Sequence, residues 1–309
     1  MLFRSPTQKI VLPICGRDFI GLRTCATCPV RFYEFRKTVA EIASLRVPMV
    51  SFSDLPKPRG MDPLYFDRRR SLEGALRWSG ISSGTPRVCI DVGANVGQTL
   101  ESFLTWWPES RCVSYEPHPE AFRELEACSL KFTSRAIVRN LGVSDSDGVL
   151  TLNMSRSEST QSSFRSFNRS AETVAAHRGL RNRPSPLELS AQLDEAQVEV
   201  SVTSLDKHLN DSSPECDWTD REVDVLKSDT QGWELNVLRG AKRTLSKTRV
   251  VLVEWQFDDV YGKPLPVWKL DELMSEFGFR LWDIAHLYKD LSSLRTLWAD
   301  IIYARPSSS

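Results

Sequence analysis

The stretch RVCIDVGANVGQTL, residues 87–100, decides the fold. Its first part, RVCIDV, is a short apolar run with β-branched residues, which is typical of a buried strand. Its second part contains Gly93 and Gly97 and continues into apolar residues at helical spacing. Glycines between a strand and a helix let the backbone turn tightly and approach a ligand closely, so the stretch predicts a ligand-binding loop.

The alternation of strand and helix continues along the chain. Strands that alternate with helices predict an α/β fold with a mainly parallel sheet and helices on both faces. A short strand of alternating apolar and polar residues at 149–153 interrupts this alternation. Further along, a single helix is expected over 233–245. The expected sheet strands are 87–93, 111–116, 135–140, 223–229, 249–255, 279–285 and 298–304.

The first 85 residues look different from the rest. They contain seven prolines, which break up long elements, and they are predicted to form a basic, partly helical N-terminal extension. Residues 86–305 are predicted to form the catalytic domain, with a polar, serine-rich insertion at 154–197. The insertion is long enough to serve as a lid over a site or to be a disordered loop.

Charge and cysteine content exclude several classes of protein. The 309 residues include 40 Lys plus Arg and 40 Asp plus Glu, so no overall charge attracts nucleic acid or an anionic membrane. The balance is uneven, because residues 1–70 hold 13 basic and 6 acidic side chains. Seven cysteines and no apolar run of membrane-spanning length predict a cytoplasmic protein with reduced thiols. Cys25 and Cys28 have metal-ligand spacing, but nothing completes a zinc site, so no metal is predicted.

The glycine loop, DVGANVG at residues 91–97, points to a particular kind of ligand. Its G-x-N-x-G spacing differs from the G-x-G-x-x-G fingerprint of dinucleotide binding. It suits a compact ligand with a carboxylate and an amine, such as the methionine end of S-adenosylmethionine. The alternative is a generic tight turn between a strand and a helix.

Glu116 ends the second expected strand, 19 residues after Gly97. An acidic residue at about this distance accepts hydrogen bonds from ribose hydroxyls in nucleotide-binding folds. The alternative is an exposed glutamate that caps the next helix. The neighbouring His118 is expected to be a surface loop residue.

Asp229 and Glu254 end two central strands. A carboxylate at the carboxyl end of such a strand faces the ligand crevice of an open sheet, where it could bind an acceptor or take its proton. The alternative for Asp229 is a helix N-cap, with Glu234 in the first helical turn. We expect Asp229 to be the base, with Glu254 as the second choice.

The segments DVGANVGQT, SYEPHPEAF, SVTSLD, LKSDTQGWELNVLRGA and VLVEW, in this order, resemble the FkbM family of S-adenosylmethionine-dependent methyltransferases over roughly residues 86–305. The resemblance implies the Rossmann-like, seven-stranded class I methyltransferase fold, S-adenosyl-L-methionine as cofactor and often O-methylation. It implies that the methionine part of the cofactor lies by the glycine loop, its ribose by Glu116 and its adenine after the third strand. The predicted cofactor-binding residues are therefore Asp91, Gly93, Ala94, Asn95, Gly97, Glu116, Asn140, Gly142 and Val143.

The acceptor side is less specific. Gln161-Ser162-Ser163 resembles a serine-containing segment of the family and is predicted to close over the acceptor. Ser228 stands where the family usually has an apolar residue, which leaves the acceptor open. The predicted acceptor-binding residues are Ser162, Ser163, Gln231 and Trp255.

The predicted reaction is methyl transfer to a hydroxyl of a small molecule or glycan. One alternative is a nucleotide-dependent oxidoreductase, which the G-x-N-x-G spacing disfavours. The other is a non-catalytic module that binds a cofactor or a partner, which the intact Gly93, Gly97, Glu116 and Asp229 disfavour. The number of subunits is left open.

Overall fold

The structure is a computed structural model, and its described residues all belong to one part of the chain. All of the described residues lie in the compact unit Asp62–Ser309. Cys25, Cys28 and most of the 154–197 insertion, including Gln161, therefore lie outside them. The described residues are 67–155, 162–166, 195–211, 222–258, 260–289 and 293–307.

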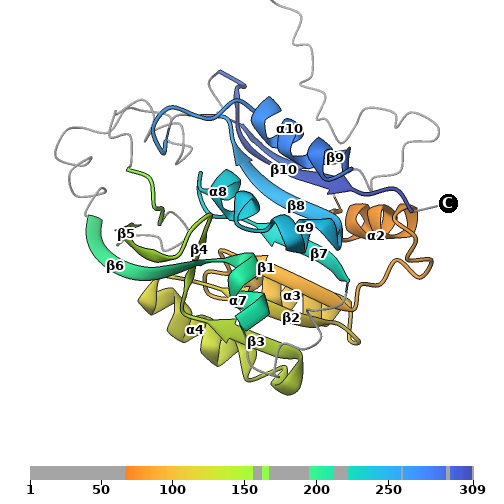
Figure 1. The fold of residues 1–309 in the computed structure, drawn as a ribbon, viewed down its shortest axis with the longest axis horizontal. Coiled ribbons are helices and arrows are strands. Elements are labelled where there is room, and N and C mark those ends of the chain that lie inside the picture. Colours follow the sequence, from red (N-terminus) through yellow and green to blue (C-terminus); the bar gives the residue numbers. More distant parts are fainter. Residues whose placement is uncertain are drawn as a thin grey trace, which may run out of the picture. The chain divides into compact units, whose positions relative to one another are not determined.

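A seven-stranded sheet forms the centre of this unit (Figure 1). Strand β10 runs antiparallel to both of its neighbours, and the other strands are parallel. The mainly parallel seven-stranded fold predicted from the sequence is confirmed. In spatial order the strands are β3 (Ala136–Arg139), β2 (Arg111–Tyr115), β1 (Val88–Val92), β7 (Val223–Ser228), β8 (Thr248–Gln256), β10 (Thr296–Ala304) and β9 (Arg280–Lys289).

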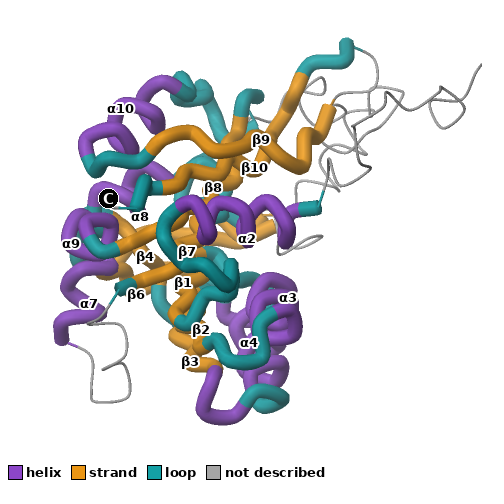
Figure 2. Tube along the Cα trace, turned by 90° about the vertical axis from the view of Figure 1, so that its right-hand side faces the viewer, coloured by secondary structure: helices purple, strands orange, loops and turns teal. Residues whose placement is uncertain are grey.

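Helices cover both faces of the sheet, and each face has its own apolar core (Figures 1 and 2). On one face lie α2 (Arg68–Trp78), α3 (Gln98–Trp106) and α4 (Pro119–Ser129). On the other lie α7 (Leu205–Asp211), α8 (Glu234–Arg239), α9 (Lys242–Ser246) and α10 (Trp268–Glu276).

Alternation along the strands decides which face a side chain reaches, because successive residues of a strand point to opposite sides. In β8, Val251, Val253 and Trp255 pack in the core with α8 and α10, whereas Val250 and Leu252 pack in the core with α2 and α3. Any other even-numbered residue of β8 therefore points to the α2 side.

A second, three-stranded sheet flanks the first, in the order β4 (Gly142–Ser144), β6 (Glu195–Ser204), β5 (Gly148–Ser155). Of these three strands only β5 was predicted, as the strand at 149–153, and β4 is too short to show a pattern. The expected single helix at 233–245 is wrong: it is divided into α8 and α9. Gly240 lies between them, where an added Cβ would be 2.0 Å from the carbonyl oxygen of Ser144 in β4.

Helix α2 comes from the stretch that the sequence assigned to the N-terminal extension, yet it packs on the sheet. The Asp67 side chain caps it by accepting a hydrogen bond from the Arg70 amide at 3.2 Å. Its residues Leu72, Ala75 and Leu76 are fully buried against the sheet. Helix α2 is therefore part of the Asp62–Ser309 unit.

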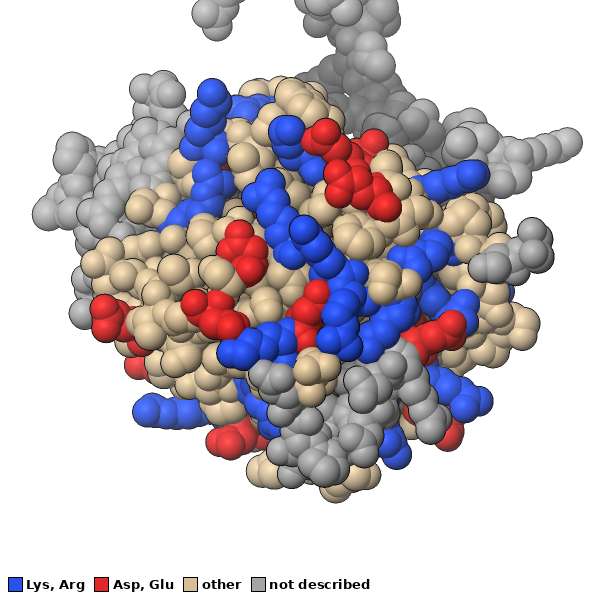
Figure 3. All heavy atoms as spheres, viewed as in Figure 1, with Lys and Arg blue, Asp and Glu red and all other residues tan. Residues whose placement is uncertain are grey.

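Figure 3 shows Lys and Arg side chains gathered near the centre of one face, over α8 and α9, with acidic side chains beside them. Arg239, Lys242 and Arg243 of these helices are exposed. The acidic surplus of the chain beyond residue 70 therefore does not dominate this face. Within the part of the chain that the structure describes, no helix is both long and apolar enough to cross a membrane.

Candidate active site

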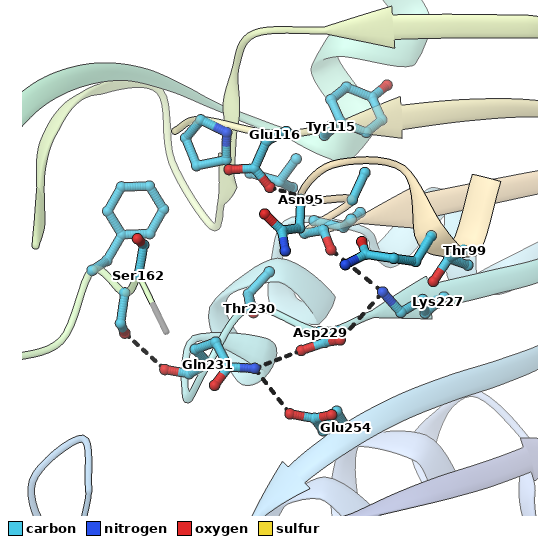
Figure 4. A pocket seen from close by; sticks show the side chains of 18 of the residues that line it. Asn95, Thr99, Tyr115, Glu116, Ser162, Lys227, Asp229, Thr230, Gln231 and Glu254 are labelled. Carbon is cyan, nitrogen blue, oxygen red and sulfur yellow. Dashed lines mark hydrogen bonds and ion pairs between the residues drawn. The ribbon is translucent and has the colours of Figure 1, made fainter. Parts of the chain in front are cut away.

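A cavity of about 560 Å³ lies at the carboxyl ends of the central strands. It is bordered by the loop after β1, the end of β2, the loop after β7 and the end of β8. Figure 4 shows Glu116 and Asn95 on one side of it, with Asp229, Gln231 and Glu254 on the other. Ligands of open α/β sheets bind at this edge, so the cavity is the candidate site.

The glycine loop has the conformation that its sequence predicts. Gly93 and Gly97 have φ angles of 80° and 100°, and Asn95 has a φ of 47°. An added Cβ on Gly93 would lie 1.8 Å from the carbonyl oxygen of Asp229, so only glycine fits there. The amides of Gly93 and Ala94 both donate to the Tyr115 carbonyl at 3.0 Å, which fixes the loop against the end of β2.

The predicted loop residues differ in how they reach the cavity. Gly93, Ala94 and Asn95 line it. Gly97 instead lies against Cys128 of α4, and Asp91 is completely buried beneath the loop. Gly97 and Asp91 therefore support the glycine loop without lining the cavity themselves.

Glu116 lies at the cavity with only 7% of its surface exposed. Its two carboxylate oxygens accept the backbone amides of Asn95 and His118, each at 2.7 Å. Burial raises the pKa of Glu116 to about 7, although both amides act in the opposite direction. The alternative of an exposed helix cap does not fit this geometry.

His118 is buried, not on the surface as expected. Its Nδ1 atom accepts the amides of Glu120 and Ala121 at 3.2 and 3.3 Å and so caps α4. Burial lowers the pKa of His118, which favours the neutral ring that this cap requires. His118 therefore has a structural role beside Glu116.

The expected adenine-binding stretch contributes one of its three predicted residues to the cavity. Val143 lines the wall together with Leu141. The Asn140 side chain points to the backbone, where Nδ2 donates to the Glu116 carbonyl at 2.8 Å. Gly142 is packed so closely that an added Cβ would lie 2.7 Å from the Phe164 ring.

Asp229 and Glu254 lie close together at the cavity, and Gln231 joins them. Its Nε2 atom donates to Asp229 Oδ1 at 2.8 Å and to Glu254 Oε1 at 2.9 Å. The Tyr261 hydroxyl donates to Gln231 Oε1 at 2.6 Å, which fixes the amide orientation. Asp229 does not cap α8, because Glu234 instead accepts the amides of the preceding loop.

The two carboxylates lie in different environments. The Asp229 side chain is one quarter exposed, at 25%, and ion-pairs with Lys227. Burial, together with the negative charges of Asp229 and Asp300, raises the pKa of Glu254 well above its ordinary value.

Lys227 is a site residue that the sequence reasoning missed. It lines the cavity, and its ammonium lies 3.1 Å from Asp91 Oδ1 and 3.3 Å from Asp229 Oδ2. The signal was present in the sequence, because Lys227 stands two residues before Asp229 and therefore on the same side of the strand.

The serine segment reaches the cavity, but the predicted tryptophan does not. Ser162 and Ser163 both line it, and the Ser163 hydroxyl donates to the Gln231 carbonyl at 2.7 Å. Trp255 does not line this cavity, because it points to the opposite face of β8 from Glu254 and packs in the core there.

Aromatic residues of the last two strands form the far wall of the cavity. The rings of Tyr288 and Trp298 are stacked, with centroids 3.9 Å apart and an interplanar angle of 11°. Trp298 stands opposite Gln256 in the sheet, so the three side chains form one row. Arg68 of α2 also lines this end and ion-pairs with the buried Asp300. None of these residues belongs to a recognisable motif.

Comparison with known proteins assigns the chain to a family. The methyltransferase FkbM domain matches residues 91–281, which is more than half of the chain. The chain belongs to the FkbM methyltransferase family. The protein is therefore a methyltransferase with S-adenosyl-L-methionine as its cofactor, which argues against the oxidoreductase and the non-catalytic module.

Individual proteins resemble this chain at low sequence identity. The methyltransferase is 23% identical to the 2-O-methyltransferase NoeI of Sinorhizobium fredii (strain NBRC 101917 / NGR234), over 62% of this chain and 72% of that one. Among solved structures, magnesium protoporphyrin IX methyltransferase from Synechocystis PCC 6803, with bound cofactor, is 8% identical over 77% of this chain and 79% of that one, with a TM-score of 0.37. Fibrillarin from Aeropyrum pernix is 14% identical over 75% and 73%, with a TM-score of 0.37.

The cavity of the methyltransferase fits S-adenosylmethionine in its donors, acceptors and apolar wall. Each Glu116 oxygen accepts one amide and keeps acceptor capacity for a ribose hydroxyl. Leu141 and Val143 give an apolar surface for the adenine. Among the residues that the structure describes, no group of three or more His, Cys, Asp or Glu is placed to hold a metal ion.

Proposed function

We propose that the methyltransferase transfers a methyl group from S-adenosylmethionine to a hydroxyl group of a small molecule or glycan. The observation that carries this proposal is the Asp229 carboxylate, which lies at the cavity between the glycine loop and the aromatic wall. A hydroxyl must lose its proton when it is methylated, and a carboxylate within hydrogen-bond reach is suited to take it. The similarity to an enzyme named a 2-O-methyltransferase gives further support.

The cofactor supplies a methyl group on a sulfonium, which is already activated for transfer. The residues on the Glu116 side would hold it. The Glu116 carboxylate would accept hydrogen bonds from the ribose hydroxyls, and the wall of Leu141 and Val143 would hold the adenine. Such fixed positioning removes much of the entropic barrier to a displacement reaction.

Asp229 is suited to act as the base because its carboxylate is held and partly accessible. Gln231 binds Oδ1 and Lys227 lies at Oδ2, so each oxygen has one fixed partner and keeps acceptor capacity. Glu254 is the second choice, since its raised pKa favours the protonated form, which accepts no proton. A protonated Glu254 would instead orient the acceptor by hydrogen bonding.

The far wall supports an acceptor that contains a ring and polar groups. The stacked rings of Tyr288 and Trp298 offer a flat apolar surface, and Gln256 beside them offers an amide. Ser162 lines the same cavity from the serine segment. Flat aromatic surface with a few convergent polar groups is the usual composition of a small-molecule site.

Three free thiols support the cytoplasmic location that we also propose. Cys89, Cys112 and Cys128 are buried and unpaired among the described residues. Reduced cysteines are the normal state in a cytosol.

The function is tested with a cofactor that carries a deuterated methyl group. The purified protein is incubated with this cofactor and a cell extract, and labelled products are sought by mass spectrometry. We expect a product that carries the label on oxygen and that is absent with the Asp229→Asn variant. A label on nitrogen or carbon, or no labelled product from protein that binds the cofactor, would contradict the proposal.

A further inference from the structure

Lys227 lies where the two halves of the site meet. It is near the end of β7, and its side chain is 7% exposed. It borders the cavity beside the glycine loop, on the cofactor side, and next to Asp229, on the acceptor side (Figure 4). Lys227 lies within the family-like segment LKSDTQGWELNVLRGA, but no role was predicted for it.

Three oxygens surround the ammonium group. Nζ lies 3.1 Å from Asp91 Oδ1, 3.3 Å from the Gly93 carbonyl oxygen and 3.3 Å from Asp229 Oδ2. A lysine ammonium has three N–H donors and no acceptor, so the three oxygens match its capacity. The group therefore cross-links β1, the glycine loop and the Asp229 loop.

We propose that Lys227 is a positioning residue that fixes the glycine loop and the Asp229 carboxylate relative to each other, so that cofactor binding at the loop changes the placement of Asp229. This inference rests on the proposed function, because it takes the loop as the cofactor site and Asp229 as the base. Lys227 acts through the loop and through Asp229.

The electrostatics keep Lys227 charged in this role. Burial alone would lower the pKa of Lys227, but the negative charges of Asp91 and Asp229 outweigh it and raise the pKa. A charge in a site with little water is costly to leave without partners, so the ammonium holds its neighbouring oxygens firmly.

The backbone adds a second link between the same two loops. The Asp229 amide donates to the Val92 carbonyl at 3.0 Å, and the Asp229 carbonyl lies where a Cβ of Gly93 would be. The two loops cannot shift independently, because the link involves both backbone and side chain. By thermodynamic reciprocity, an acceptor that binds at Asp229 should in turn strengthen cofactor binding.

The ¹⁵Nζ chemical shifts of lysines, detected through the neighbouring CεH₂ protons, test the coupling without an acceptor. The full-length protein is titrated with S-adenosylmethionine and with S-adenosylhomocysteine, and binding is measured in parallel by calorimetry. We expect the Lys227 signal to move on binding and also in Asp229→Asn, while the Lys207 signal stays in place. Lys207 is a suitable control because it pairs with Asp147, away from the cavity.

The outcomes separate the inference from the proposed function. Cofactor binding with an unchanged Lys227 signal overturns the inference and leaves the function standing. Absence of cofactor binding overturns the proposed function and the inference with it. An unchanged Lys227 signal in the Asp229→Asn variant also overturns the inference, since it would mean that Lys227 does not interact with the Asp229 carboxylate.

Matched variants give a second measurement. Lys227→Met keeps the volume of the side chain and removes the charge, so we expect cofactor affinity to fall by about tenfold or more. Lys207→Met should leave that affinity unchanged. Equal affinities in the two variants would overturn the inference, and if Lys227→Met does not fold, the chemical-shift titration of the unaltered protein decides.

Discussion

Asp229 and Glu254 share a single hydrogen-bond donor, the Nε2 atom of Gln231, at 2.8 and 2.9 Å. The shared donor holds the two acids close together, and their surroundings differ. Lys227 lies beside Asp229, whereas burial raises the pKa of Glu254. In the proposed function, Asp229 takes the proton of the acceptor, and the raised pKa of Glu254 favours its protonated form.

Replacing Asp229 with asparagine should lower kcat by about 100-fold or more, because the amide cannot take the proton of the acceptor. Cofactor affinity should change little, since asparagine has nearly the same size and shape as aspartate. Single-turnover kinetics and calorimetry on the same preparation measure the two effects separately.

Glu254→Gln is the matched comparison for this acid pair. Glutamine resembles a protonated glutamate, so we expect a decrease in kcat of about tenfold or less. If Glu254→Gln abolishes transfer while Asp229→Asn retains it, the roles of the two acids are reversed.

Cofactor binding should weaken as the pH falls through about 7, where the raised pKa of Glu116 lies. Ribose hydroxyls donate to the ionised carboxylate, so each pH unit below that value should cost about tenfold in affinity. The folding stability of the protein without cofactor should depend on pH in the opposite direction. Because the pKa of Glu116 is raised from 4.5 to about 7 on folding, its contribution to stability is fully present below about 4.5 and is lost as the pH rises through about 7. Calorimetry from about pH 5.5 to about pH 8.5, a range that brackets the pKa of Glu116, measures how cofactor affinity depends on pH.

In Glu116→Gln this dependence on pH should disappear. The cofactor should bind more weakly than to the unaltered protein above pH 7 (about the Glu116 pKa) and change little with pH. A variant that retains the full pH dependence would show that another group titrates.

Gly93→Ala should destabilise the protein by about 3 kcal/mol or more, because its Cβ would overlap the Asp229 carbonyl and the backbone must move. Gly278→Ala is the control: Gly278 has a similar φ of 76° and open space around it, so only the backbone strain remains, about 1 kcal/mol. Urea unfolding measures both. Equal losses would mean that the loop yields to the extra methyl group.

Arg68→Met should cost about 2 kcal/mol, since it leaves the buried Asp300 carboxyl without its partner. The neighbouring Arg69→Met removes an exposed pair with Glu73 and should cost less than about 0.5 kcal/mol. Thermal or urea unfolding compares the two variants. A smaller loss for Arg68→Met than for Arg69→Met would contradict the role of the Asp300 pair.

Much of the site follows from the sequence because its residues stand at or directly after the ends of apolar strands. The glycine loop, Glu116 and Asp229 follow such strands, Glu254 lies near the end of one, and the structure brings all of them to one edge of the sheet. Their individual roles remain predictions that the variants above test.

Other parts depend on which face a residue takes and on distant packing. Trp255 was expected in the acceptor pocket, but Glu254 already points there and its neighbour must point away. Asn140 has its amide engaged with a backbone carbonyl, which no motif indicates. Arg68 and Trp298 reach the site only because β10 pairs with β8 and α2 packs against both strands, and this arrangement is not visible in local sequence.

Helix α2 has a consequence for how this protein is cut or fused. It ends before residue 91, where the FkbM domain match begins, yet its Leu72, Ala75 and Leu76 are wholly enclosed by the sheet. A fragment that starts at the family border would uncover these contacts and lose the Arg68 wall of the cavity. The segment that matches the family is thus shorter than the compact unit Asp62–Ser309, and expression should begin upstream of Asp67.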